Sequence, residues 1–399
     1  MTARIETESA FPTVPLGSIV DFLDHMRRPV KSTERAEGPY PYFGANGQQG
    51  TIDSFIFDEP LVLLAEDGGH FSTPERGIAY RISGKTWVNN HAHVLRPRVG
   101  VDANFLCRVL ENRNVTRFIT GSTRAKLTKA GAARIPVPFP AIAQQRQIAQ
   151  VLDQVDALRV KRREALACLE ELAQSIFYDM FGDPVENPKG WDRIPLADLL
   201  DRIDSGKSPV CLDRPAVGEE WGVLKLGAVT RCVYRPAENK ALPEGVAGEV
   251  ENEVRVGDLL FSRKNTIELV GAVAYVRDTR ERLLIPDLIF RLVPKQNARI
   301  DKVYLHGLLT YPSKRGKVRS LASGSAASMS NISKAKLLNL ECEVPPLELQ
   351  IEYAARVNMI EAVKSSHLAH LAEIDALFSS LQYRAFRGEL CPAEVAAVD

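Results

Sequence analysis

Two stretches of the chain carry basic residues and no acidic residue, which is the chemistry that contacts DNA phosphates. They run from 112 to 134 and from 313 to 336, and the whole chain has a net charge of only +1. Each stretch encloses a small hydroxyl-rich loop with a glycine, at 120–123 and at 323–325. Lys and Arg neutralise phosphates, while hydroxyls and backbone N–H groups fit close to phosphate oxygens. A lone basic run is more often a solvated surface, but its recurrence at equivalent places favours a duplicated contact with the DNA backbone.

Polar side chains near these loops could also read bases. Asn and Gln pair with adenine edges in two places at once, and Arg does the same with guanine. The predicted DNA-binding residues are Asn46, Gln48, Gln49, Arg117, Thr120, Ser122, Thr123, Arg124 and Lys126 in the first half, and Lys207, Arg263, Lys264, Asn265, Lys314, Lys317, Arg319, Ser323 and Ser325 in the second.

Motifs for catalysis are missing from the sequence. It has no phosphate-binding G-x-x-x-x-G-K-[ST] loop, and its G-rich stretches lack the dinucleotide-binding spacing. Residues 187–189 lack the second proline and the aromatic residue of an amino-methyltransferase loop, and 238–240 lack the upstream Pro-Asp of a nuclease motif. The pair His367 and His370 is interpreted as helix seam or flank rather than as a metal site, and 91–93 as a strand edge. We therefore expect no catalytic residue, metal or cofactor in this chain.

Two long helices are predicted to position the basic loops. The stretch from 138 to 183 has the 3-4 apolar spacing of a helix that needs a partner. The stretch from 345 to 388 repeats it 205 residues later, with Pro140 matching Pro345 and Gln145 matching Gln350. The predicted seam of the resulting coiled coil comprises Val151, Val155, Leu158, Leu169, Leu172, Ile176, Ile360, Val363, Ile374, Leu377 and Leu381.

The repeat unit is a globular part followed by a long helix. Residues 12–23 resemble 192–203, whereas the regions between each such entry and its helix scarcely match and read as mixed strands and turns. The fold class is therefore α+β, with two mixed α/β domains, two long helices and an internal repeat. The predicted boundaries are 1–140 and 191–344 for the domains, 141–182 and 345–388 for the helices, 183–190 for a linker and 389–399 for a tail.

The pattern resembles the specificity subunit of type I restriction-modification systems over most of the chain, from about Val14 to Leu390. The motifs that carry the resemblance are Gly121-Ser122-Thr123 with the prolines at 136–140 and Gln145-Arg146-Gln147-Ile148, then Gly324-Ser325 with 344–351, the closing 386–390, and in the first domain 42–47 with 65–69. The first half departs from the family at Ala143-Gln144, where an acid usually precedes the glutamine, and at Phe139, which separates the prolines.

This resemblance implies a non-catalytic subunit whose two target-recognition domains each read one half of a split, asymmetric site in double-stranded DNA. The two helices would form an antiparallel coiled coil related by a pseudo-twofold repeat, which would set the half-site spacing and dock two modification subunits that carry an adenine methyltransferase. Restriction subunits would add ATP-driven translocation and cleavage, so S-adenosylmethionine, ATP and Mg would belong to partners.

Further expectations are a cytoplasmic protein with reduced cysteines and no membrane span. The alternatives are a coiled-coil protein-interaction adaptor without DNA binding, and a stand-alone nuclease or methyltransferase.

Overall fold

The computed structural model describes residues 10–73, 76–121, 124–246, 248–323 and 329–390. The chain forms two compact units, and the boundary between them falls within the two long helices. Unit 1 comprises Met1–Glu164 and Ala369–Asp399, and unit 2 comprises Ala165–Leu368. Among the described residues, no helix is long and apolar enough to cross a membrane.

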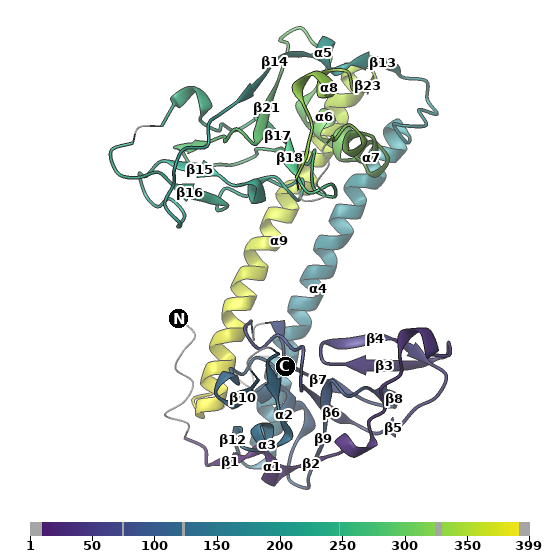
Figure 1. The fold of residues 1–399 in the computed structure, drawn as a ribbon, viewed down its shortest axis with the longest axis vertical. Helices are drawn as coiled ribbons and strands as arrows, with labels where there is room; N and C mark the ends of the chain where they lie inside the picture. The colour runs from purple at the N-terminus through teal and green to yellow at the C-terminus, as the bar shows by residue number, and fades with distance from the viewer. Residues whose placement is uncertain (1–9, 74–75, 122–123, 247, 324–328, 391–399) are drawn as a thin grey trace. The chain divides into compact units, whose positions relative to one another are not determined.

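Unit 1 is built on an antiparallel four-stranded sheet in the order β2-β9-β6-β7, with a second sheet beside it in the order β4-β3-β8-β5 (Figure 1). Its strands are β1 (Thr13–Pro15), β2 (Val20–Phe22), β3 (Tyr40–Gly44), β4 (Gly47–Ile52), β5 (Phe57–Asp58), β6 (Leu61–Ala65), β7 (Ala79–Ile82), β8 (Lys85–Val88), β9 (Ala92–Pro97), β10 (Ile119–Thr120), β11 (Lys126–Leu127) and β12 (Pro136–Pro138). Its shorter helices are α1 (Leu16–Ile19), α2 (Ala103–Leu110) and α3 (Lys129–Ala133), with 3-10 turns at Asp24–Met26, Ser32–Glu34 and Thr116–Phe118. Every residue of β6 is apolar and buried, as expected for the inner strand of a covered sheet.

Unit 2 has a four-stranded sheet of its own, in the order β14-β21-β17-β19, and a smaller sheet in the order β16-β15-β20. Its strands are β13 (Asp192–Pro195), β14 (Leu200–Ser205), β15 (Gly222–Leu224), β16 (Asn239–Ala241), β17 (Leu259–Ser262), β18 (Lys264–Asn265), β19 (Val273–Tyr275), β20 (Leu283–Leu284), β21 (Ile289–Pro294), β22 (Ser330–Asn331) and β23 (Glu341–Val344). Its shorter helices are α5 (Leu196–Leu199), α6 (Lys302–Thr310), α7 (Pro312–Ser320) and α8 (Lys334–Leu338), with 3-10 turns at Leu226–Ala228 and Val250–Asn252.

The two units repeat one arrangement. In each, a short strand near the start of the unit's globular part pairs antiparallel with the strand that precedes a long helix, as β1 with β12 and β13 with β23. Asp102 caps α2 and Asp301 caps α6, each by accepting a hydrogen bond from a backbone N–H of the first turn. Thr128 and Ser333 cap α3 and α8 in the same way. The internal repeat predicted from the sequence is therefore a repeat of structure, and the α+β fold class is confirmed.

A buried glutamine fastens each long helix to its own unit. Gln145 is fully buried; its Oε1 accepts from the N–H of Asp102 at 2.9 Å, and its Nε2 donates to the carbonyls of Gly100 and Pro140. Gln350 makes the equivalent three bonds in unit 2, beginning with the N–H of Asp301 at 2.8 Å. This explains why a glutamine recurs at the start of both helices, since its amide satisfies three backbone groups that would otherwise lie buried without partners.

The long helices α4 (Ile142–Phe181) and α9 (Leu347–Arg387) are uninterrupted and run antiparallel (Figure 1). In unit 1 the first part of α4 shares a core with the last part of α9, including Phe378 and Phe386. In unit 2 the last part of α4, through Phe177 and Phe181, shares a core with the first part of α9. The end of α4 thus contributes to the core of unit 2, and the end of α9 contributes to the core of unit 1.

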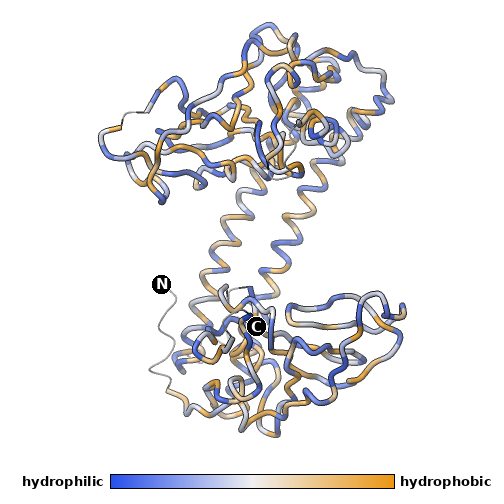
Figure 2. Tube along the Cα trace, viewed as in Figure 1, coloured by the Kyte–Doolittle hydropathy of each residue, from blue (hydrophilic) through white to orange (hydrophobic). Residues whose placement is uncertain are grey.

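The predicted seam is buried only in part. Val151, Val155, Ile360 and Leu381 are buried, and Leu169, Ile176 and Ile374 are half-buried. In contrast, the seam prediction needs correction at four positions, whose side chains are 45–52% exposed: Leu158, Leu172, Val363 and Leu377. Polar pairs join the helices near these positions, Arg159 with Asp375 in unit 1 and Lys364 with Glu170 in unit 2. Figure 2 shows hydrophobic and hydrophilic residues alternating along both helices. The 3-4 spacing therefore predicts two long helices correctly without implying a continuous apolar seam.

Candidate nucleic-acid interface

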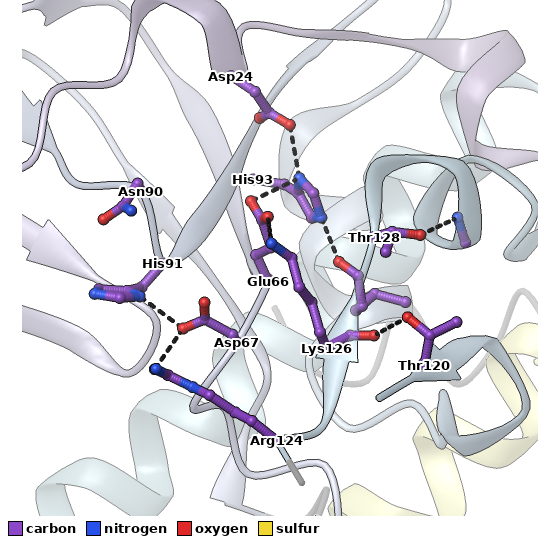
Figure 3. A network of polar contacts seen from close by, with 12 residues as sticks. Asp24, Glu66, Asp67, Asn90, His91, His93, Thr120, Arg124, Lys126 and Thr128 are labelled. Atoms are coloured by element: carbon purple, nitrogen blue, oxygen red, sulfur yellow. Dashed lines mark hydrogen bonds and ion pairs between the residues drawn. The ribbon is translucent and has the colours of Figure 1, made fainter. Parts of the chain in front are cut away.

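In unit 1 the basic stretch returns to the end of the inner strand β6. The N–H of Leu127 donates to the carbonyl of Glu66 at 2.7 Å, and Asp67 lies opposite Lys126 as an isolated antiparallel bridge. We call this contact between the end of β6 and the basic stretch the junction of unit 1. Two ion pairs reinforce it: Lys126 with Glu66 at 2.9 Å and Arg124 with Asp67 at 2.8 Å (Figure 3). The backbone register thus holds two predicted DNA-binding cations at one edge of the sheet.

Two other segments of unit 1 meet the same junction. His91, just before β9, places Nδ1 2.6 Å from the Oδ1 of Asp67 that also accepts from Arg124, and Asn90 beside it is exposed (Figure 3). Asn46, at the turn between β3 and β4, donates to the carbonyl of Gly68 at 2.9 Å. The loop after β6 therefore gathers the hairpin turn, the basic loop and the segment before β9 into one polar surface.

The exposed Gln48 and Gln49 follow that turn on β4. Gln48 donates to the carbonyl of Gly50, and the side-chain oxygen of Gln49 accepts from Asn89 at 3.1 Å. A β-hairpin with polar residues near its turn has the size and shape to enter the major groove.

Beneath this surface lies a buried charged network. His93 is 1% exposed; its Nδ1 is 2.7 Å from Asp24 Oδ2 and its Nε2 is 2.7 Å from the carbonyl of Leu127 (Figure 3). Both ring nitrogens are therefore engaged by partners within the unit. Arg27 donates to Glu66 at 2.7 Å from the other side. The network ties the carboxylate that pairs with Lys126 to the core of the unit.

Asp24, Glu66 and His93 are, within the described residues, the group whose ligand atoms could hold a metal ion. Burial alone would raise the pKa of Asp24, but its hydrogen bond and charge interaction with His93 outweigh burial and lower it. Burial is likewise outweighed at Glu66, whose pKa is lowered by hydrogen bonds from Lys126 and Arg27. Both nitrogens of His93 already have partners, Asp24 at Nδ1 and the carbonyl of Leu127 at Nε2. The cations already present neutralise both carboxylates, so the group fits a structural network rather than a metal site.

Unit 2 builds an equivalent junction with different side chains. The N–H of Ile332 donates to the carbonyl of Arg263 at 2.8 Å, and Lys264 lies opposite Asn331 in the β18–β22 pair. Arg263 Nε donates to Asn331 Oδ1 at 3.3 Å, and its guanidinium lies over the ring of Phe290, 5.0 Å from the centroid. Asn265, the next residue, donates to the hydroxyl of Thr230. Three of the predicted DNA-binding residues thus lie together at the end of β17.

The other predicted residues of unit 2 differ in their surroundings. Lys317 and Arg319 are exposed on α7, and Ser323 is bonded to the backbone of Asn331. Lys207 is exposed and paired with Glu249. The prediction for Lys314 needs correction, because its side chain is 4% exposed and forms an ion pair with the equally buried Glu343.

In unit 1 the remaining predicted residues include Arg117, which is exposed, and Thr120, whose hydroxyl donates to the carbonyl of Lys126 at 3.3 Å. The predictions for Ser122, Thr123 and Ser325 lie outside the described residues.

Sequence reasoning did not select as DNA-binding four residues that form these junctions: Glu66, Asp67, His91 and Asn331. The available signal was the end of an apolar strand followed at once by polar residues, as in Leu61–Ala65 before Glu66. It did not reveal which distant segment pairs with that strand end.

The fold defines a class of protein: a duplicated α+β protein in which each domain shares its core with parts of two long helices. Residues 8–167 match the family model "Type I restriction modification DNA specificity domain". The first part of this chain is therefore similar to the DNA specificity domain of type I restriction-modification systems.

Individual proteins are similar to this chain over part or most of its length. The chain is 32% identical over 177 residues to the type I restriction enzyme EcoEI specificity subunit of Escherichia coli, a match covering 44% of this chain and 29% of that relative. It is 22% identical over 381 residues to the EcoKI specificity subunit of Escherichia coli, covering 86% of this chain and 80% of that one. The fold is similar to the crystal structure of the type I restriction-modification S subunit from M. genitalium, with a TM-score of 0.61, 14% identity and coverage of 96% and 98%.

Proposed function

We propose that this chain is the sequence-specific DNA-binding subunit of a type I restriction-modification complex, and that each unit reads one half of a bipartite, asymmetric site. The observation that carries the proposal is the duplicated junction: in both units a basic, acid-free segment returns to the end of the same inner strand. Cations supply affinity for phosphates, and polar groups on fixed strands supply base readout.

The predicted partners are double-stranded DNA, two modification subunits with adenine methyltransferase activity, and restriction subunits. S-adenosylmethionine, ATP and Mg would be bound by those partner subunits. The half-buried and exposed apolar side chains along α4 and α9, such as Leu158 and Leu377, are the surfaces we expect a protein partner to cover.

The helices would also set the distance between the two half-sites. DNA makes a full turn in about 10 base pairs, or roughly 34 Å, so changing the gap between two half-sites alters both their separation and their rotational phase. We therefore expect one fixed gap length in the recognised sequence.

Methylation sequencing of the source genome with and without this gene tests the function. The expected result is loss of N6-methyladenine at one asymmetric motif that has two half-sites and a fixed gap. A methylation pattern that does not depend on the gene, in cells that express an intact modification partner which co-purifies with the chain, would contradict the proposal.

A further inference from the structure

The two junctions occupy equivalent positions but carry inverted charges. Glu66 and Arg263 each provide the carbonyl that accepts from the returning strand, so they correspond. Asp67 and Lys264 each lie opposite the residue just before that donor, Lys126 or Asn331, so they correspond too. Unit 1 therefore ends its inner strand with two carboxylates, and unit 2 ends the same strand with two cations.

Despite this inversion, in each junction a guanidinium donates to a side-chain oxygen across the contact between the strand end and the returning segment. In unit 1 the guanidinium is Arg124 of the basic loop, and the acceptor is Asp67 at the strand end, at 2.8 Å. In unit 2 the guanidinium is Arg263 at the strand end, and the acceptor is Asn331 of the returning segment, at 3.3 Å. Both junctions thus contain an arginine bonded to a side-chain oxygen. The arginine comes from the returning segment in unit 1 and from the strand end in unit 2.

Such a pairing limits how the guanidinium can turn. A carboxylate or carboxamide that accepts a hydrogen bond from one nitrogen of the guanidinium fixes the plane of that group. Recognition of a base through two parallel hydrogen bonds requires such a fixed plane. Asp67 is itself held by His91 at 2.6 Å, and Arg263 is further fixed over the ring of Phe290. A phosphate contact needs only a nearby positive charge, so this degree of orientation favours recognition of a planar partner.

Resting on the proposed function, we propose that Arg124 in unit 1 and Arg263 in unit 2 are the guanine-reading residues of the two half-sites, positioned by Asp67 and Asn331. Guanine offers two acceptors, N7 and O6, on its major-groove edge, which match the fork of a guanidinium. Each half-site then contains a G·C pair read by one oriented arginine.

Lysine substitutions separate base reading from phosphate contact, because lysine keeps the charge and loses the fork. The full-length chain and its variants would be selected against a duplex library with random half-sites and random gap. We expect the wild type to enrich a bipartite motif with a guanine in each half. R124K should reduce the preference for guanine about 5- to 150-fold at one position of one half, and R263K should do so in the other half only.

Matched controls are exposed arginines outside the predicted DNA-binding set. R134K in unit 1 and R255K in unit 2 change such residues and should leave base preference unchanged at every position. The positioning role predicts that D67N, which keeps the shape of the side chain, weakens the preference at the position affected by R124K and leaves the other half intact. A purely structural role of Asp67 would lower binding to all sequences together.

Outcomes distinguish this inference from the function on which it rests. If the wild type selects a bipartite motif but R124K and R263K keep its guanines, the two arginines are phosphate contacts and the inference is wrong. The same holds if either half-site lacks a G·C pair. If the wild type selects no bipartite motif, the proposed function fails, and the inference fails with it.

Discussion

Replacing Gln145 by alanine tests the account of how each long helix is fastened to its unit. The Gln145 amide makes three hydrogen bonds to the backbone, to the N–H of Asp102 and to the carbonyls of Gly100 and Pro140, at 2.9, 3.1 and 2.9 Å. Alanine removes all three bonds and leaves the three backbone groups without their partner.

The size of the effect follows from these bonds. Each contributes a net stabilisation of about 1 kcal/mol, and a group left buried without a partner costs about 1–3 kcal/mol. The three together give about 3 kcal/mol for unit 1, with water entering the space limiting the loss. For a unit of this size, about 3 kcal/mol corresponds to a fall in melting temperature of roughly 6–12 °C.

The assay combines thermal unfolding with hydrogen exchange of single amides. Q145A should lower the unfolding temperature of unit 1 and speed exchange of the Asp102 amide, whose acceptor has been removed. Q144A is the matched control, since Gln144 is exposed and adjacent on the same helix, and it should change stability by less than about 0.5 kcal/mol. Equal effects of Q145A and Q144A, or an Asp102 amide that exchanges as slowly as in the wild type, would refute the reasoning.

Three further predictions concern charges. K314M should destabilise unit 2 by about 1.5–3 kcal/mol in chemical unfolding, because it removes the nearer partner of the buried Glu343 carboxylate and leaves Arg193 at 3.4 Å. Adding E343Q should recover much of that loss; no recovery would contradict the prediction. The lowered pKa of Glu66 means that its unfolded state binds the proton more tightly, so the stability it contributes is present above about pH 4.5 and lost as pH falls through the folded-state pKa. E66Q should therefore make the acid unfolding of unit 1 less steep, and an unchanged acid profile would count against the network. K317A, at an exposed lysine, should reduce the slope of log affinity against log salt by about 1 without changing base preference, and an unchanged slope would exclude a phosphate contact.

Local patterns predicted the elements of this fold well. The 3-4 spacing of apolar residues depends only on near neighbours in sequence, and it predicts the two helices that the structure has at Ile142–Phe181 and Leu347–Arg387. The same spacing could not show that Leu158 and Leu377 are half exposed. That outcome depends on how closely the helices approach, and Arg159 and Asp375 join them nearby through charge.

The candidate site was less predictable because it depends on strand register. The bridge between Asp67 and Lys126 joins residues far apart in sequence, and nothing in either segment alone specifies the other. Lys314 shows the same limit for charge: an acid-free basic run cannot reveal that one of its lysines pairs with Glu343, 29 residues away, inside the unit. Composition indicates which segments are candidates for contact with DNA. Strand register decides which of their side chains remain exposed for that contact.

The most direct test of the central claim is equilibrium binding of the full-length chain to its selected DNA site and to matched duplexes. In one matched duplex a single half-site is scrambled, and in another the gap is longer by one base pair. Our account predicts that both changes weaken binding strongly, because the proposed reading by two units of one chain requires both half-sites at one spacing and phase. Equal affinity for all three duplexes would contradict it.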